Sequence, residues 1–191
     1  FVYCTKFDKR GKPILYKNMH IEKLKHLDFD YFLEKVGDHR ISVHHGRFNM
    51  VSTTMKEFYQ QMVAGNDRDY LKSEDEYNLL GMLGIKGEII NEFGKLFDKN
   101  VKNIIGRDLG FWMGGKGTTT GWHTDIEDLN YLYLVKGKKR IMLISPMYNE
   151  CMYEENNTVF GARYSSIGFK NVDYDKYPKF KNVVIHTSVS Y

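Results

Sequence analysis

A histidine and a carboxylate two residues apart, His123 and Asp125, are the side chains of this sequence best suited to bind a metal. They lie in a segment, residues 121–125, whose pattern predicts a β-strand, and residues two apart in a strand point to the same face. An imidazole and a carboxylate on one face supply two of the three ligands of a 2-His-1-carboxylate site, which holds Fe(II) for oxygen chemistry.

Such a pair is weak evidence by itself, because 7 His and 24 Asp and Glu among 191 residues give about one His-x-acid sequence by chance. Two further pairs are indeed present, His20 with Glu22 and His26 with Asp28. Both fall in an apolar pattern that predicts a helix at about residues 21–36, where side chains two apart diverge around the axis. We interpret these two pairs as solvated helix charges.

The composition fits a single folded domain over residues 1–191, with 42% hydrophobic and 15% aromatic residues. No apolar run approaches the roughly 20 residues of a membrane span, and no signal peptide pattern is present. Phe1 in place of Met is typical of a piece of a longer chain. Cys4 and Cys151 are expected as free thiols in a reducing intracellular compartment, the cytoplasm or nucleus. The formal charge of +4 permits nucleic acid as a partner but does not indicate it.

The sequence pattern of the first part of the chain, about residues 1–108, predicts a mixture of strands and helices. A strand pair is expected within residues 1–19, a strand at 40–44 and a helix at about 87–98. Thr54 and Glu57 form a capping box that predicts a helix to about Val63. Residues 67–80 are polar and predicted to be irregular.

The second part, about residues 109–191, changes to short apolar runs separated by Gly, Asn and Pro. The runs cover residues 109–113, 121–125, 129–135, 140–144 and 183–189. Several short strands at this spacing favour a β-sandwich or barrel. The predicted fold class is mainly β, a jelly-roll or cupin core (a double-stranded β-helix) with a helical N-terminal support.

A basic turn follows the strand at 129–135. Residues 136–138 predict a turn, and residues 139–144 predict the returning strand of a hairpin. Because side chains alternate, Lys139 and Arg140 face opposite sides, so one cation must lie with apolar neighbours towards the barrel interior. Burial of a cation is costly unless an anion pairs with the cation, and an anionic ligand inside the barrel would provide that pairing. The alternatives are an exposed hairpin tip or a basic patch for nucleic acid.

The ordered set of motifs resembles the JmjC-type, cupin-fold Fe(II)/2-oxoglutarate-dependent oxygenases, in particular their small protein-hydroxylase branch. The residues that carry this resemblance are Trp112, Gly114, Thr120, His123, Asp125, Asn130, Lys136, Gly137, Lys139, Arg140, Ser145 and Pro146. Residues 12–16 and 173–180 are similar to segments before and after this core, so the resemblance covers nearly the whole chain.

The resemblance implies a set of roles for the site residues. His123 and Asp125 would bind Fe(II), and Lys139 would bind the distal carboxylate of the cosubstrate 2-oxoglutarate. Thr120 and Asn130 would also face the cosubstrate, and Tyr70 would supply another contact.

The implied reaction is hydroxylation of a protein side chain with release of succinate and CO2. Demethylation of N-methyl-lysine and hydroxylation of a tRNA base are alternatives with the same chemistry. The oligomeric state and the exact substrate stay open.

The third metal ligand is the point at which the sequence departs from the resemblance. The family's distal His is expected past Tyr191, and His186 comes too early after Pro178 to match it. If a third ligand is absent, the protein would instead be an inactive pseudo-oxygenase or an interaction module with an open sheet edge.

Overall fold

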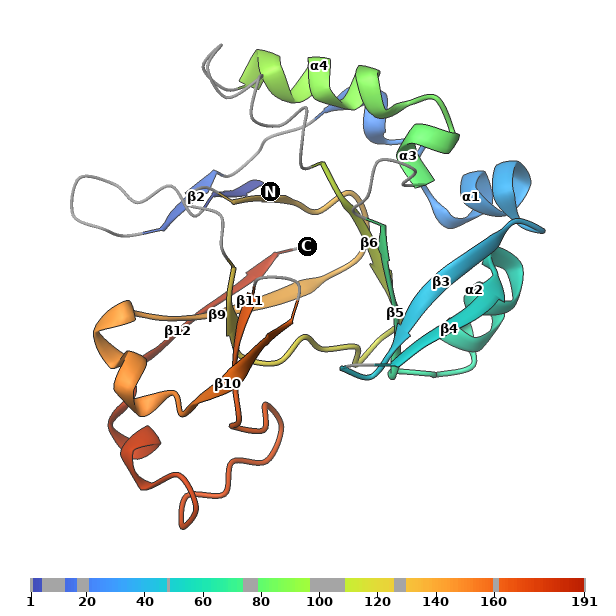
Figure 1. The fold of residues 1–191 in the computed structure, drawn as a ribbon. Helices are drawn as coiled ribbons and strands as arrows, with labels where there is room; N and C mark the ends of the chain where they lie inside the picture. Colours follow the sequence, from blue (N-terminus) through green and yellow to red (C-terminus); the bar gives the residue numbers. More distant parts are fainter. Residues whose placement is uncertain are drawn as a thin grey trace. The chain divides into compact units, whose positions relative to one another are not determined.

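The structure is a computed structural model that describes residues 2–4, 13–16, 21–47, 49–73, 79–96, 109–125, 130–159 and 162–190 (Figure 1). The chain forms two compact units, one of residues 21–119 and one of residues 1–20 and 120–191. Every strand pairing in the described ranges is antiparallel, which confirms the predicted mainly-β class. No helix within these ranges is long and apolar enough to cross a membrane.

The unit of residues 21–119 is built on one four-stranded sheet, in which the strands lie in the order β4-β3-β5-β6. These strands are β3 (Arg40–His45), β4 (Asn49–Thr54), β5 (Asp69–Ser73) and β6 (Phe111–Gly114). Ile41 and Val43 of β3 alternate with exposed residues and are buried, as is Leu71 of β5. The predicted strand at 40–44 is therefore confirmed.

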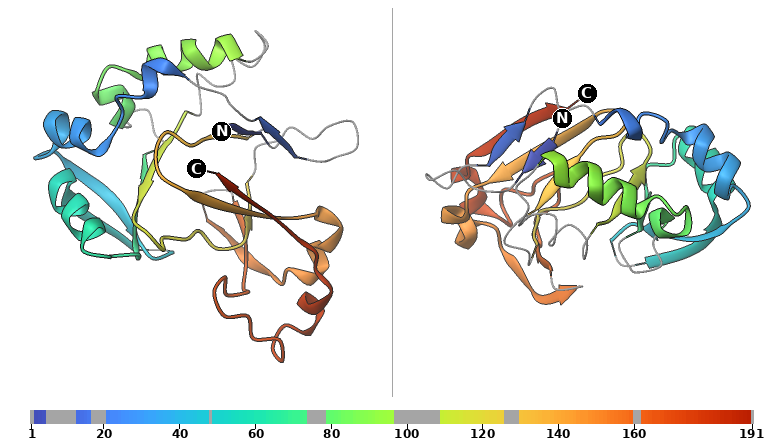
Figure 2. Two further views of the ribbon diagram at one scale, coloured as in Figure 1. Left: turned by 180° about the vertical axis from the view of Figure 1, so that it is seen from behind. Right: turned by 90° about the horizontal axis from the view of Figure 1, so that it is seen from above.

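Two helices, α1 (Phe29–Val36) and α2 (Met55–Val63), lie beside this sheet (Figures 1 and 2). Aromatic contacts join α1 to the sheet and to α2. The ring of Phe32 on α1 packs against Phe111 of β6, with centroids 4.9 Å apart. Phe29 packs against Tyr59 of α2 at 5.3 Å. The other α-helices in the described part of the unit are α3 (Leu79–Met82) and α4 (Lys86–Leu96), and α4 confirms the helix predicted at about 87–98.

The single helix predicted at 21–36 is wrong. A 3-10 turn, η1 (Glu22–Leu24), precedes α1, and Asp28 caps α1 by accepting a hydrogen bond from the Tyr31 backbone N–H at 3.0 Å. Asp28 has extended backbone angles, as N-cap residues do, because its side chain bonds to the backbone of the first helical turn and so favours a helix start at this position. His26 thus lies in a turn rather than in a helix, and His20 lies outside the described residues.

The prediction that residues 67–80 are irregular is also wrong, because they contain β5 in the interior of the sheet, and α3. Leu71 and Asp69 are both buried. Because Asp69 is a charged residue, the sequence of this segment suggests an exposed position, although the segment lies inside the sheet. The error arose because a buried carboxylate reads as an exposed residue until its hydrogen-bond partners are known.

The capping box of α2 is formed as predicted. Thr54 Oγ1 accepts from the Glu57 backbone N–H at 3.1 Å, and the Thr54 backbone N–H donates to Glu57 Oε2 at 2.9 Å. Thr53 Oγ1 also donates to Glu57 Oε2, at 3.0 Å. The Thr54 backbone hydrogen bond, followed by those of the Thr53 and Thr54 side chains, holds the pKa of Glu57 below its ordinary value.

This lowered pKa predicts a specific acid sensitivity. Because the folded state binds the Glu57 proton more weakly than the unfolded state, the stabilisation is fully present above the ordinary carboxyl pKa. It is lost as the pH falls through the lowered folded value. We expect Glu57→Gln to flatten the fall in urea midpoint between neutral and acid pH. An unchanged acid dependence in this variant would contradict the assignment.

The unit of residues 1–20 and 120–191 contains three small sheets, with orders β2-β1-β8, β10-β11-β7 and β12-β9. Their strands are β1 (Val2–Cys4), β2 (Ile14–Tyr16), β7 (His123–Thr124), β8 (Tyr131–Tyr133), β9 (Lys139–Ile144), β10 (Glu154–Val159), β11 (Ala162–Ser165) and β12 (Ile185–Ser190). The pairing of β1 with β2 confirms the predicted N-terminal strand pair.

A compact apolar cluster forms the core of this unit. Its buried members are Trp122, Ile167, Tyr177 and Phe180. The 3-10 helix η3 (Pro178–Asn182) contributes Phe180 to this cluster, and η2 (Pro146–Cys151) ends next to Met152, which packs against it.

The predicted hairpin at residues 136–138 is wrong. The strand β8 pairs with β1, whereas β9 pairs with β12, so this turn joins strands of two different sheets. Gly137 has a φ of 93°, which glycine tolerates at little cost in such a turn. The strands β4, β10 and β11 were not predicted, because their sequences are largely polar.

Candidate metal centre

The short strand β7 presents His123 directly opposite Tyr164 of β11, and their rings stack with centroids 5.4 Å apart and planes at 22°. The preceding residue, Trp122, belongs to the core cluster, because successive side chains of a strand alternate between faces. The Ser165 backbone N–H donates to the Trp122 carbonyl at 3.0 Å and continues the pairing beyond the strand. The core therefore fixes the backbone from which His123 projects.

The two ring nitrogens of His123 have different surroundings. Nδ1 lies 2.7 Å from the carbonyl oxygen of Gly121, which can only accept, so Nδ1 carries a hydrogen. Nε2 lies 3.4 Å from Oδ1 of Asp125. In a neutral ring with hydrogen on Nδ1, Nε2 is an acceptor, so two acceptors face each other. A cation between them, either a proton or a metal ion, removes this conflict.

The geometry of this pair fits two ligands of one metal ion. Donor atoms 3.4 Å apart can both lie about 2.1 Å from the same ion, the usual length of such bonds. The side chains of His123 and Asp125 are 29% and 40% exposed, so solvent ions can reach them. The described residues contain no group of three His, Cys, Asp or Glu side chains that could hold a metal. A third donor would therefore have to come from elsewhere.

Asn130 lies at this same pair. Its Nδ2 donates a hydrogen bond to Oδ2 of Asp125 at 2.9 Å, which leaves Oδ1 on the side of His123. Such a contact orients a ligating carboxylate and is typical of residues that support metal ligands. The cosubstrate contact expected of Asn130 stays a prediction, and its contact with Asp125 was not foreseen.

Lys139 begins β9 and is half-buried, opposite Ser190 of β12. Met142 and Ile144 of the same strand pack against the core cluster, so Lys139 points to the other face. His186 shares that face, since it lies opposite Leu143 in the register. It is exposed, and among the described residues it does not join His123 and Asp125 in a metal-binding group.

The other two residues predicted to contact the cosubstrate, Thr120 and Tyr70, are far from each other in the sequence. Thr120 is half-buried and immediately precedes Gly121, whose carbonyl orients His123. Tyr70 belongs to the other compact unit, on β5, where it pairs with His44 and Gly114. A Cβ on Gly114 would lie only 2.8 Å from the ring of Tyr70, so glycine is needed there.

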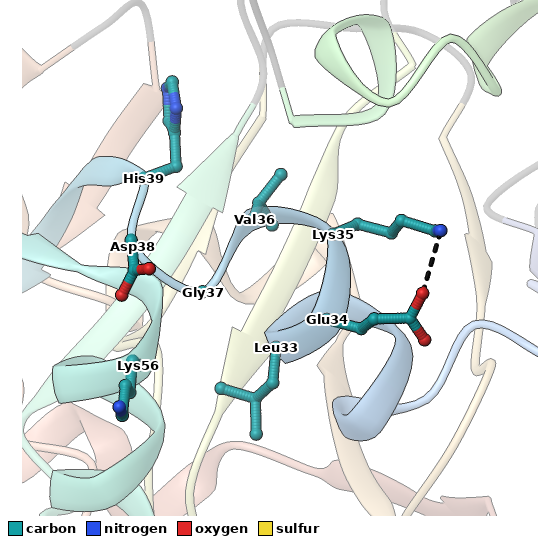
Figure 3. A pocket seen from close by; sticks show the side chains of 8 residues that line it. All are labelled: Leu33, Glu34, Lys35, Val36, Gly37, Asp38, His39 and Lys56. Carbon is teal, nitrogen blue, oxygen red and sulfur yellow. Dashed lines mark hydrogen bonds and ion pairs between the residues drawn. The ribbon is translucent and has the colours of Figure 1, made fainter.

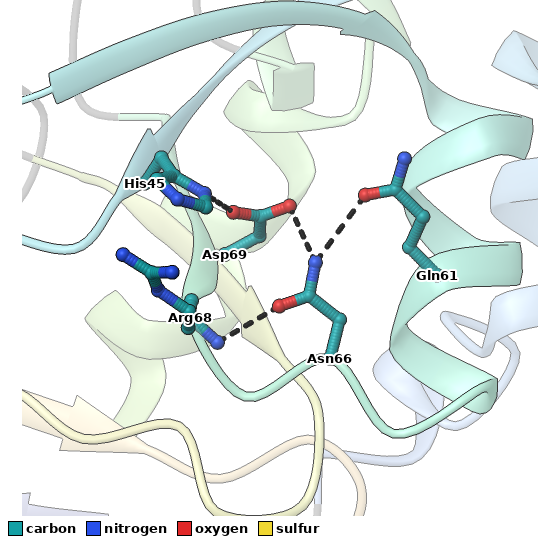
Figure 4. Close-up of polar contacts among 5 residues, drawn as sticks. All are labelled: His45, Gln61, Asn66, Arg68 and Asp69. Carbon is teal, nitrogen blue, oxygen red and sulfur yellow. Dashed lines mark hydrogen bonds and ion pairs between the residues drawn. The ribbon is translucent and has the colours of Figure 1, made fainter.

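A polar network that sequence reasoning missed connects β3 with β5 in the unit of residues 21–119 (Figure 4). Nδ1 of His45 lies 2.5 Å from Oδ1 of the buried Asp69. Nδ2 of Asn66 donates to Oδ2 of Asp69 at 2.7 Å and to Oε1 of Gln61 at 3.3 Å. Both carboxylate oxygens of Asp69 are thus paired, which explains how this charge is accommodated inside the sheet.

A surface hollow of about 570 Å³ lies in the same unit (Figure 3). It is lined by Leu33, Glu34, Lys35, Val36, Gly37, Asp38, His39 and Lys56. Lys35 and Glu34 form an exposed ion pair of 2.9 Å at its rim. None of the predicted site residues lines this hollow, so it is not the candidate centre.

Comparison with known proteins agrees with the predicted fold. A model of the cupin-like domain matches residues 5–190, and the chain belongs to this family, which supports the resemblance to JmjC-type, cupin-fold proteins. The fold class predicted from the sequence is thereby confirmed. The family commonly includes Fe(II)/2-oxoglutarate oxygenases.

Two curated relatives show how much is shared. The chain is 35% identical over 85 residues to JmjC domain-containing protein D of Dictyostelium discoideum, covering 44% of this chain and 18% of that protein. It is 26% identical over 153 residues to human HSPB1-associated protein 1, covering 72% of this chain and 30% of that protein. The chain therefore spans less than a third of either relative.

Proposed function

We propose that the protein is an Fe(II)- and 2-oxoglutarate-dependent oxygenase that hydroxylates a protein side chain and releases succinate and CO2. The observation that carries this proposal is the approach of His123 Nε2 to Asp125 Oδ1 at 3.4 Å, with Nδ1 held by the Gly121 carbonyl. A metal ion between these two acceptors would satisfy both, and an imidazole with a carboxylate suits Fe(II). A third donor is expected from residues that follow Tyr191.

Each site residue would have a separate role in this reaction. His123 and Asp125 would hold Fe(II), which when bound supplies the redox chemistry that activates dioxygen. Asn130 orients the carboxylate of Asp125 through its hydrogen bond. Lys139 would pair with the distal carboxylate of 2-oxoglutarate, and its half-buried position would strengthen that ion pair relative to one in water.

Anaerobic titration with Fe(II) and 2-oxoglutarate tests this function. We expect a visible absorption band that requires both additions, and succinate release when oxygen is admitted. The titration is made on the 191-residue chain and on a longer chain extended past Tyr191. If the longer chain shows neither band nor succinate, the oxygenase function is wrong, and the pseudo-oxygenase alternative takes its place.

The same experiment resolves the role of Lys139. Lys139→Ala should raise the 2-oxoglutarate concentration needed for half-saturation by roughly 10- to 100-fold, since a hydrogen bond to a charged group contributes about 1.5–3 kcal/mol. Lys138→Ala is the matched control, because Lys138 is the adjacent lysine but is exposed. Equal effects of the two substitutions would refute the assignment.

A further inference from the structure

The ring of Tyr164 covers one face of the His123 imidazole. We propose that Tyr164 is a positioning residue, which holds His123 in the ring orientation that directs Nε2 towards Asp125. The proposal concerns the geometry of this chain's own side chains, and it rests on the proposed function only where it concerns metal affinity.

Two contacts of different kinds are needed to fix an imidazole. The hydrogen bond from Nδ1 to the Gly121 carbonyl, at 2.7 Å, restrains one atom of the ring but allows the plane to tilt about it. The stack with Tyr164, at 22° between planes, restrains the plane itself. Together they leave Nε2 one direction, which is the direction of Asp125 Oδ1 at 3.4 Å.

Tyr164 can act in this way because its own backbone is fixed. It lies directly opposite His123 in the pairing of β11 with β7. The next residue, Ser165, is buried, and its Oγ donates to the Met152 carbonyl and accepts from the Ile167 backbone N–H. A ring on such a rigid segment can orient a metal ligand in the way that supporting residues around metal sites do.

Two substitutions separate the aromatic ring from the hydroxyl. Tyr164→Leu removes the ring while keeping apolar bulk, and Tyr164→Phe keeps the ring. Arg163→Ala is the matched control, since Arg163 is adjacent on β11, faces the other side and forms an exposed ion pair with Glu154 at 3.3 Å. Each variant is examined by NMR of the His123 ring protons without metal, and then by titration with Co(II) alone.

We expect Tyr164→Leu to lose the upfield ring-current shift of the His123 protons and the proximity of that ring to Asp125. It should also weaken Co(II) binding about tenfold, as loss of a supporting residue does. Tyr164→Phe and Arg163→Ala should retain all three properties.

Each contrary result identifies what is wrong. An unchanged ring-current shift in Tyr164→Leu would mean that the stack does not form. A lost shift with unchanged His123–Asp125 proximity and unchanged Co(II) affinity would mean that Tyr164 only packs. Either result overturns the positioning role. If the wild-type chain extended past Tyr191 binds no Co(II), the proposed function loses its support, and the metal-free proximity measurement decides the role of Tyr164 by itself.

Discussion

Replacement of His123 by alanine is expected to abolish metal binding and 2-oxoglutarate turnover together. His123 supplies the one imidazole that lies beside Asp125 among the described residues, and Asp125 cannot hold the ion with one ligand. The loss of metal affinity should exceed the roughly 100-fold upper range seen when a residue that only supports a ligand is removed. Isothermal titration with Co(II), and succinate release with Fe(II), measure the two effects on the longer chain.

The matched control for this prediction is His186→Ala. His186 is exposed on β12, on the face shared with Lys139, and it is not grouped with His123 and Asp125 within the described residues. We therefore expect its removal to leave Co(II) affinity and succinate release unchanged. If His186→Ala were as damaging as His123→Ala, His186 would be the third ligand, and a donor beyond Tyr191 would not be needed.

Replacement of Phe58 by alanine is expected to cause one of the largest losses of stability in the unit of residues 21–119. Phe58 on α2 is 1% exposed and is among the largest fully buried side chains. Truncation of a buried phenylalanine costs about 3–5 kcal/mol, because apolar surface is lost and a cavity remains. That is a large part of the 5–15 kcal/mol typical of a folded domain. Urea unfolding followed by circular dichroism measures the change.

Val63→Ala provides the comparison on the same helix. Val63 is the last residue of α2 and is 68% exposed, so its truncation should change the free energy of unfolding by less than about 0.5 kcal/mol. Because both substitutions place alanine in one helix, a difference between them reports burial rather than helix propensity. Equal destabilisation would show that α2 does not pack through Phe58.

The elements predicted correctly are those whose signals are local. The helix α2 was predicted because its capping residues, Thr54 and Glu57, are three positions apart and act on each other. The strand at 40–44 was predicted because its buried residues alternate with exposed ones. The strand β5 was missed because Asp69 is buried only through partners from β3 and the loop before β5.

The site shows the same division. The pairing of His123 with Asp125 was predicted from a spacing of two in a strand over residues 121–125. The structure places the two side chains together, although its strand is shorter and Asp125 directly follows β7. The contact of Asn130 with Asp125 joins residues on either side of positions 126–129, which lie outside the described part of the chain, and the spacing of the two residues does not predict it. Tyr164 could not be found without knowing that β11 is the partner of β7, because the largely polar segment before it hid the strand.

The pairing of β1 with β8 has a consequence for how the chain folds as it is made. Residues 21–119 lie between these two strands, so synthesis completes that unit before β8 exists. The unit can therefore bury its own core first, whereas among the described strands β1 has β2 alone as a partner until residues 131–133 emerge. During this interval one edge of β1 lacks its β8 partner, and an unpaired strand edge can pair with other chains.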